Sequence, residues 1–474
     1  MATQDNTSRN EDGLLQPDIL EEVPFHTPKK QETSTQSPQP PINRIPIELL
    51  IDIFRLVIGK RDSTVIRTLL LVCQQWYNTI NNTAYLWSTI AIYPKDFLED
   101  IPRVSKFIST AVEKSLDLPI EVHFDFTHIP VMGFLVGPQD VGQERLKSHL
   151  DDLLLRVVGD KGETMRRWRT FIFRINHVLD CLPAFNTILI HPTPNLRELQ
   201  LHLNLSMEVT NPVQFMSELS TLRTLVLVTK TSPLDFISSA NSLQSLSFEV
   251  HGIIDLTATL EPFQNLCDLT LNFNWPPLLD HTQVQTVCLP RLERFTLIFD
   301  DLFYFPVHLM KMIEMPSLRT LRLLGHPAID QVLKAQLYTN VHSLHLLTKR
   351  SPNVFGEPRR FRKTMTLPFL ASRLQHYTAL RNLVVARWHL TTAMGALRYL
   401  IVKGEAPVAL RSVTALIRDC NWGILSDDTV FWTLMTPGRE IEDYVYVEHP
   451  FTVDKIRSPT TETRKIVIRH SQYF

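Results

Sequence analysis

The sequence IPIELLIDIF at residues 45–54 begins the most strongly patterned part of this 474-residue chain. LLLVCQQW at 69–76 and YLW at 85–87 follow it. Pro46 suits the first turn of a helix, because the N–H that proline lacks would be unbonded there, and Gly59 can end the helix in the left-handed conformation. The stretch therefore predicts a helix over about 46–58, with Glu48 near the positive end of the helix dipole.

The predicted helix is apolar over more than one stripe, because apolar side chains recur at Leu49, Leu50, Ile53, Phe54, Leu56 and Val57. Beyond Ser63, which can act as an N-cap, steps of three and four residues continue the pattern through Leu69, Val72, Cys73, Trp76 and Ile80. About fifty residues are too few to bury two apolar faces well. We therefore expect a partner protein to cover part of this surface.

The three stretches, in this order, resemble the F-box family. That family begins with Leu/Ile-Pro-x-Glu-Leu/Ile-Leu, continues with Leu-x-x-Val-Cys/Ser-x-x-Trp/Phe and ends near a Leu-Trp pair. The sequence departs at Gln74, where the family usually has Lys or Arg. The resemblance implies binding to the small adaptor subunit that links such a box to the cullin scaffold of a RING-type ubiquitin ligase.

The resemblance also implies which residues line or shape the adaptor interface: Ile45, Pro46, Leu49, Leu50, Ile53, Phe54, Val72, Cys73 and Trp76. An alternative stays open for some of the apolar residues. Leu50, Leu69 and Trp76 could instead form the core of the box itself.

A second pattern, apolar-x-x-apolar-x-apolar, occurs ten times after the box, with first positions at Trp168, Leu196, Leu222, Leu243, Leu266, Leu292, Leu318, Val341, Leu380 and Leu410. Seven of the nine gaps between these positions fall within the roughly 20–29-residue period of leucine-rich repeats. The usual Asn or Cys after the last leucine is present only as Asn204 and Asn274. We call the ten copies of this pattern the ladder, and the three apolar residues of each copy its ladder positions. The ladder resembles the irregular leucine-rich arrays attached to many F-box proteins. It predicts an α/β fold in which a small helical box precedes an irregular solenoid, with a curved parallel sheet and helices on its convex side.

The expected organisation has five parts. Residues 1–41 form a disordered tail, 42–92 the box, 93–165 an N-terminal cap or degenerate repeats, 166–426 the repeat array, and 427–474 a C-terminal cap or tail. Within these, Ile120–Phe126 alternates apolar and polar residues like a strand, and residues 146–158 are spaced like a helix. The segments 444–447 and Ile466–Ile468 are short apolar strands without a clear repeat.

Residues that alternate with the core leucines lie on the opposite face of the predicted sheet. That face is expected to be mostly polar, with apolar spots that mark a target site. A basic insertion in the longest gap suits carboxylate or phosphate. The candidate target-binding residues are Val226, Val228, Ile298, Arg322, Leu324, Leu347, Arg359, Arg360 and Arg362. The alternatives are that another segment covers the apolar spots and that the basic insertion is a solvated loop.

Composition narrows the class of protein. The charge is nearly balanced, with 48 basic and 49 acidic residues, which argues against binding nucleic acid or a membrane through bulk electrostatics. The sequence has no long apolar run or apolar leader, so we expect a soluble protein of the cytoplasm, the nucleus or both. Five scattered cysteines indicate neither a disulfide framework nor a zinc site. With 14 glycines, no phosphate-binding loop and no nucleophile motif, we expect neither an enzyme nor a cofactor.

The sequence thus favours a non-catalytic substrate receptor of a ubiquitin ligase, with the box on the adaptor and the repeats on an unknown target protein. The alternative is an adaptor-bound leucine-rich-repeat scaffold that takes no part in ubiquitin transfer. An enzyme within 93–165 is a distant third reading.

Overall fold

The computed structural model describes residues 45–58, 63–93, 101–126, 139–159, 161–175, 191–203, 219–228, 241–250, 256–273, 286–299, 312–325, 329, 332–333, 339–347, 366–386, 390–407, 409–416, 429–433, 446–448 and 452–454. The chain divides into two units, Met1–Pro46 and Ile47–Phe474, and all of the helices and strands given below belong to the second. The predicted tail, the basic insertion with Arg359, Arg360 and Arg362, the residues Asn204 and Asn274, and Ile466–Ile468 lie outside the described residues.

The second unit begins with a small helical region. It comprises α1 (Ile47–Ile58), α2 (Ser63–Leu70), α3 (Gln74–Asn82) and the 3₁₀ helix η2 (Ala84–Trp87). The apolar spacing from 63 to 80 predicted one continuous helical face, and this is wrong. α2 ends through the bonds from Leu71 N to Thr68 O (3.2 Å) and from Val72 N to Leu69 O (3.3 Å), and Cys73 has an extended backbone.

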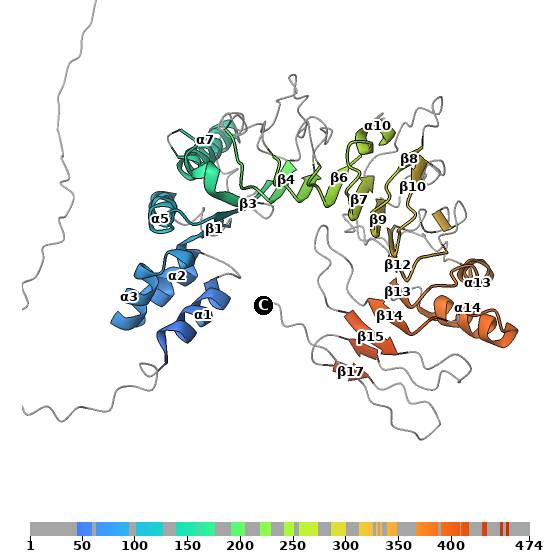
Figure 1. Ribbon diagram of the computed structural model, residues 1–474. Coiled ribbons are helices and arrows are strands. Elements are labelled where there is room, and N and C mark those ends of the chain that lie inside the picture. Colours follow the sequence, from blue (N-terminus) through green and yellow to red (C-terminus); the bar gives the residue numbers. More distant parts are fainter. Residues whose placement is uncertain are drawn as a thin grey trace, which may run out of the picture. The chain divides into compact units, whose positions relative to one another are not determined.

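A 13-stranded sheet follows directly, with its strands in chain order except that β8 and β10 are skipped (Figure 1). Its first twelve strands are parallel, and β15 closes the sheet antiparallel to β14. The strands are β1 (Thr89–Ile92), β2 (Ile120–Phe126), β3 (Trp168–Ile175), β4 (Glu198–Leu203), β5 (Thr224–Val228), β6 (Ser245–Glu249), β7 (Asp268–Phe273), β9 (Arg294–Phe299), β11 (Thr320–Leu324), β12 (Ser343–Leu347), β13 (Asn382–Ala386), β14 (Ser412–Leu416) and β15 (Thr429–Thr433).

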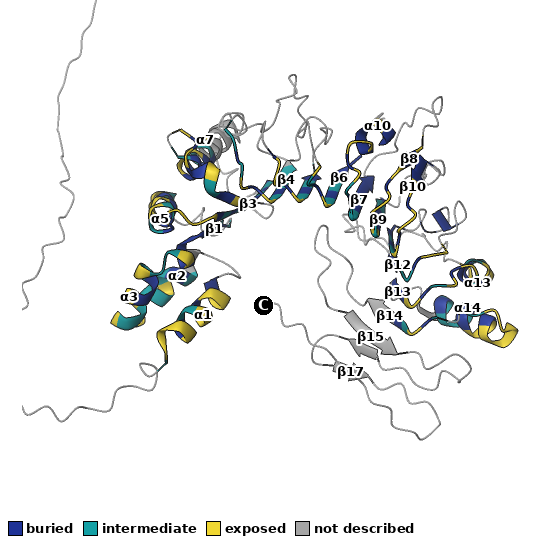
Figure 2. Ribbon diagram, viewed as in Figure 1, coloured by how far each residue is buried: buried dark blue, intermediate teal, exposed yellow. Residues whose placement is uncertain are grey.

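The core lies along one face of this sheet, and the ladder supplies it. All ten expected strands are present, and every ladder position is buried except Ala415, whose burial lies outside the description (Figure 2). The registers align equivalent leucines of successive strands, as in Leu199 with Leu225 and Leu201 with Leu227. Because side chains of a strand alternate between faces, this register directs one apolar row after another to the same side.

Just before the strands, side chains bind the backbone of the preceding coil. Asn195 Nδ2 donates to Arg166 O, Thr221 Oγ1 to Pro194 O and Asn265 Nδ2 to Asn241 O, each at 2.7 Å, and Ser317 Oγ donates to Pro290 O at 2.6 Å. These polar residues all stand immediately before the first leucine of their repeat. Their hydrogen bonds therefore connect each coil to the one before it.

Helices and one small two-stranded sheet lie between the strands of the large sheet, and a second small sheet follows β15 in the chain. They are α5 (Ile101–Lys114), α7 (Gln139–Val158), the 3₁₀ helix η3 (Thr164–Arg167), α10 (Leu256–Leu260), α13 (Leu367–Leu374) and α14 (Leu390–Lys403), with β8 (Val287–Cys288) parallel to β10 (Ile313–Glu314) and β16 (Tyr446–Glu448) antiparallel to β17 (Thr452–Asp454). None of the helices in the described parts of the chain has both the length and the apolar character needed to cross a bilayer.

The prediction of an α/β chain with a parallel sheet and a small helical N-terminal region is confirmed, whereas the curved solenoid stays a prediction. The sheet also begins earlier than the predicted array at 166. β2 lies in the segment expected to be a cap, and β1 lies within the segment expected to be the box.

Candidate partner-binding surfaces

The helical region has its own small core. Leu50 and Phe54 on α1 are buried, and the Phe54 ring meets the Trp76 ring of α3 edge-on with centroids 4.8 Å apart. Trp87 closes the core, because its Nε1 donates to Ile80 O at 2.9 Å. Leu50 and Phe54 were predicted to line or shape an interface. Both side chains lie in the core of the helical region, as the alternative has it for Leu50, and a role for them in an adaptor interface stays a prediction.

A second apolar stripe of α1 is exposed. Leu49, Ile53 and Leu56 have 55%, 43% and 66% of their surface accessible, and Ile47 and Val57 are exposed as well. Because successive residues of a helix are 100° apart, Leu49, Ile53 and Val57 form a row directly beside the buried row of Leu50, Phe54 and Ile58. The helix thus has one apolar row in the core and another facing solvent.

The turn between α2 and α3 extends this apolar surface. Leu71 and Val72, which follow the end of helix α2, are exposed. Cys73, the N-cap residue of α3, is half-buried and makes no side-chain cap bond. Trp76 is half-buried, and within the described part of the chain its Nε1 is buried without a hydrogen-bond partner.

Of the nine predicted adaptor contacts, four are therefore exposed (Pro46, Leu49, Ile53 and Val72), three are half-buried (Ile45, Cys73 and Trp76) and two are buried (Leu50 and Phe54). Exposed apolar residues that the prediction left out are Ile47, Leu56, Val57 and Leu71. Leu56 and Val57 were already part of the helical periodicity, so the sequence held the signal for them.

The helical region is tied to the start of the sheet. Lys114 at the end of α5 donates from Nζ to Asn81 Oδ1 at 2.9 Å and lies over the Trp87 ring, 5.5 Å from its centroid. Phe107 of α5 also contacts Trp87, with centroids 6.4 Å apart. Only Ser88 separates η2 from β1.

The segment that carries this exposed surface matches a known family. Residues 42–93 match the F-box-like family, so this segment is an F-box-like domain, and it covers the three helices, η2 and β1. The resemblance inferred from the sequence motifs is thereby confirmed for this segment. No curated protein matches the chain.

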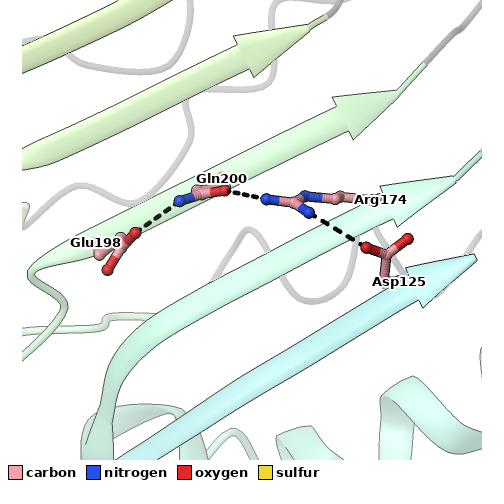
Figure 3. Close-up of polar contacts among 4 residues, drawn as sticks. All are labelled: Asp125, Arg174, Glu198 and Gln200. Atoms are coloured by element: carbon pink, nitrogen blue, oxygen red, sulfur yellow. Dashed lines mark hydrogen bonds and ion pairs between the residues drawn. The ribbon is translucent and has the colours of Figure 1, made fainter. Parts of the chain in front are cut away.

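The sheet face opposite the core is polar at its N-terminal end. Arg174 of β3 donates from Nη1 to Asp125 Oδ2 of β2 at 3.2 Å and from Nη2 to Gln200 Oε1 of β4 at 3.0 Å. Gln200 in turn donates from Nε2 to Glu198 Oε1 at 2.6 Å (Figure 3). This relay crosses three strands and fixes the orientation of each side chain in it.

Two histidines flank the relay, His123 on β2 and His202 on β4. Burial, and secondarily the charge of Arg174, lowers the pKa of each imidazole to about 4, while Asp125 partly opposes the shift at His202. His345 on β12 has its pKa lowered to about 3 by burial and then by Arg322. All three imidazoles are therefore neutral at pH 7 and contribute hydrogen-bonding atoms, not charge, to this face.

The predicted target-binding residues on the described strands do lie on this face, but they differ in exposure. Val226, Val228, Ile298 and Arg322 are half-buried. Leu324 and Leu347, predicted as apolar surface, are buried and cluster with Val384, and Ile298 packs against them. Val384 was missed because it lies in the apolar run NLVVA, where both faces of the strand look alike.

The described residues contain no group of three or more His, Cys, Asp or Glu side chains that could hold a metal ion. The two candidate surfaces differ in character, with an exposed apolar row on α1 and a hydrogen-bonding face on the sheet.

Proposed function

We propose that this chain is the substrate-recognition subunit of an SCF-type cullin-RING ubiquitin ligase. The F-box-like domain points to an adaptor-binding role, and through the adaptor the chain joins the cullin. The strand ladder, read as a degenerate leucine-rich-repeat array, holds the target protein. The observation that carries the proposal is an exposed apolar row on α1 within a segment that matches the F-box-like family.

Magnitudes support the adaptor contact. Burying a Leu, Ile or Val side chain contributes roughly 1.5–3 kcal/mol. Leu49, Ile53, Leu56 and Val72 have 55%, 43%, 66% and 50% of their surface exposed, so together they contribute roughly 3–6 kcal/mol on burial. This is comparable to the lower part of the roughly 4–15 kcal/mol that association costs in lost freedom. Half-buried Ile45, Cys73 and Trp76 add to the same surface.

We place target contacts on the sheet face at Val226, Val228 and Arg322, beside Ile298, and in the basic insertion with Arg359, Arg360 and Arg362. Leu324 and Leu347 support Ile298 from within their cluster. The chain supplies no acid, base or nucleophile in this proposal. It raises the effective concentration of target lysines near the ubiquitin-charged enzyme.

Reconstitution with adaptor, cullin, RING subunit and charged conjugating enzyme tests the proposal. We expect the chain to co-purify with the adaptor and its captured protein to gain ubiquitin. The variant Leu49→Asp/Ile53→Asp should lose both, because it places two charges in the apolar row. Asp52→Asn, an exposed change on the polar side of α1, is the matched control and should lose neither.

Adaptor binding without ubiquitin on any captured protein would instead favour the scaffold reading. Failure of the wild-type chain to bind the adaptor would contradict both. Phe54→Asp is unsuitable here, because it would place a charge in the core.

A further inference from the structure

A row of arginines lies where the strands begin. Each residue that follows the first ladder position in three successive coils is an exposed arginine: Arg169 on β3, Arg197 before β4 and Arg223 before β5. Arg166 of η3 is exposed beside them. We call these four residues the arginine row.

Backbone bonds hold the row in register. Arg197 N donates to Arg169 O at 2.8 Å, and Arg223 N donates to Arg197 O at 2.9 Å. Adjacent parallel strands are about 4.8 Å apart, so Arg169 and Arg223 start roughly 10 Å from each other. Asn195 and Thr221, which donate to the carbonyls of Arg166 and Pro194, connect the same coils just before Arg197 and Arg223.

The charges of the row are uncompensated within the described part of the chain. None of its four side chains forms an ion pair or a side-chain hydrogen bond with another described residue. Some other arginines of the sheet are paired, as Arg174 is with Asp125 at 3.2 Å and Arg294 with Asp268 at 2.8 Å, and the nearby Glu198 accepts from Gln200 on the sheet face. Like charges at neighbouring strand positions repel, and a bound anion would relieve that repulsion.

We propose that the arginine row is a docking surface for an acidic segment of a partner protein. Guanidinium groups match carboxylates in a planar, two-bond geometry, and single charges spread along a line suit a run of Asp or Glu side chains. A protein is favoured over nucleic acid because the net charge of the chain is −1, which supplies no long-range attraction for a polyphosphate. The proposal does not depend on adaptor binding.

The test uses the full chain and a fluorescent peptide of about twelve residues in which about half are glutamate. Anisotropy should show binding that weakens as salt is raised from about 50 to about 200 mM, as expected for exposed charges. A peptide with Gln at each Glu should not bind.

Arg169→Gln/Arg197→Gln/Arg223→Gln should raise Kd about tenfold or more. The matched control is Arg319→Gln/Arg381→Gln/Arg411→Gln, which removes three exposed arginines from the same repeat position elsewhere and should change Kd less than about twofold. The corresponding triple change to Lys keeps the charge and should retain part of the affinity, because lysine lacks the planar fork. It also reports on the site should the Gln variant fold poorly.

Equal weakening in both Gln triples would overturn the proposal, since it would indicate general charge attraction. Absence of wild-type binding, or tighter binding of a single-stranded oligonucleotide of equal charge, would overturn it as well.

Discussion

The ring of Phe54 meets the ring of Trp76 at an angle of 69°, with centroids 4.8 Å apart. This contact joins α1 to α3 across a turn that breaks the helical pattern. Phe54 belongs to the buried apolar row of α1, which holds the helical region together, whereas the neighbouring row with Leu49 and Ile53 remains on the surface. Substitutions in the buried row should therefore lower stability, and substitutions in the exposed row should instead weaken binding.

Phe54→Ala should destabilise the chain by about 3–5 kcal/mol, because it removes a fully buried ring and leaves a cavity against Trp76. Urea denaturation followed by tryptophan fluorescence measures this. Ile53→Ala, on the exposed neighbouring row, is the control and should change the free energy of unfolding by less than about 0.5 kcal/mol. Similar losses in both variants would show that the two rows are not distinct.

Leu56→Ala/Val57→Ala should weaken adaptor binding about tenfold, although neither residue was among the predicted contacts. Both side chains are exposed on α1, and each truncation removes apolar surface worth on the order of 1 kcal/mol when buried. Titration calorimetry with the adaptor measures the change. Val402→Ala, an exposed position on α14, should have no effect on Kd. Unchanged affinity in the double variant would place the interface elsewhere.

Acid should destabilise the sheet through its neutral histidines. His123 and His202 have folded pKa values of about 4 against 6.5 when unfolded, so the unfolded chain binds more protons between these values. The free energy of unfolding should therefore be fully retained above about pH 6.5 and fall as the pH drops towards 4, with each unit of pKa difference worth about 1.4 kcal/mol at most.

Denaturation at pH 7, 6 and 5 measures this slope. His202→Gln should flatten it, because one titrating group is removed, whereas Ser247→Ala on the same face should leave it unchanged. A slope that is the same in His202→Gln and wild type would show that His202 titrates alike in the folded and unfolded chain.

Gly325→Ala should cost more than about 1 kcal/mol. Gly325 has φ +113°, and an added Cβ would stand 2.5 Å from the carbonyl oxygen of Phe299, which cannot move without disturbing β9. Gly404→Ala is the matched control, because Gly404 also has positive φ, +72°, but an added Cβ there meets nothing within 4 Å. Thermal unfolding should show the larger loss at Gly325, and the reverse order would contradict the steric explanation.

The regular parts of the fold were predictable because apolar spacing alone decides them. Helix α1 and the ten ladder strands follow from side chains that recur every three to four or every two residues. The break before Cys73 was missed because residues 69–73, LLLVC, are all apolar and LLLVCQQW contains neither Gly nor Pro to interrupt the pattern. β1 was missed because TIAI is too short to show an alternation.

The site was only half predictable for a different reason. Leu49 and Leu50 are neighbouring leucines on the apolar side of α1, and the sequence does not show which of them is buried. Which of them is internal depends on the side chains that reach the helix from the rest of the helical region, chiefly Trp76 of α3. The sheet-face relay depends likewise on register, which brings Asp125, Arg174 and Gln200 together from three strands.

The pairing of β1 with β2, Thr89 to Glu121 through Ile92 to Phe124, has a practical consequence for anyone who trims this chain. Cutting after the F-box-like domain would remove the outermost strand and bare the hydrogen-bonding groups along one side of β2. An unpaired strand edge of this kind pairs readily with strands of other chains. A fragment that begins at residue 93 should therefore precipitate or self-associate, and a fragment that ends there should carry a dangling strand. A C-terminal fragment should therefore begin upstream of Thr89, so that β1 stays paired with β2, and an N-terminal fragment should end upstream of Thr89, so that it carries no unpaired strand.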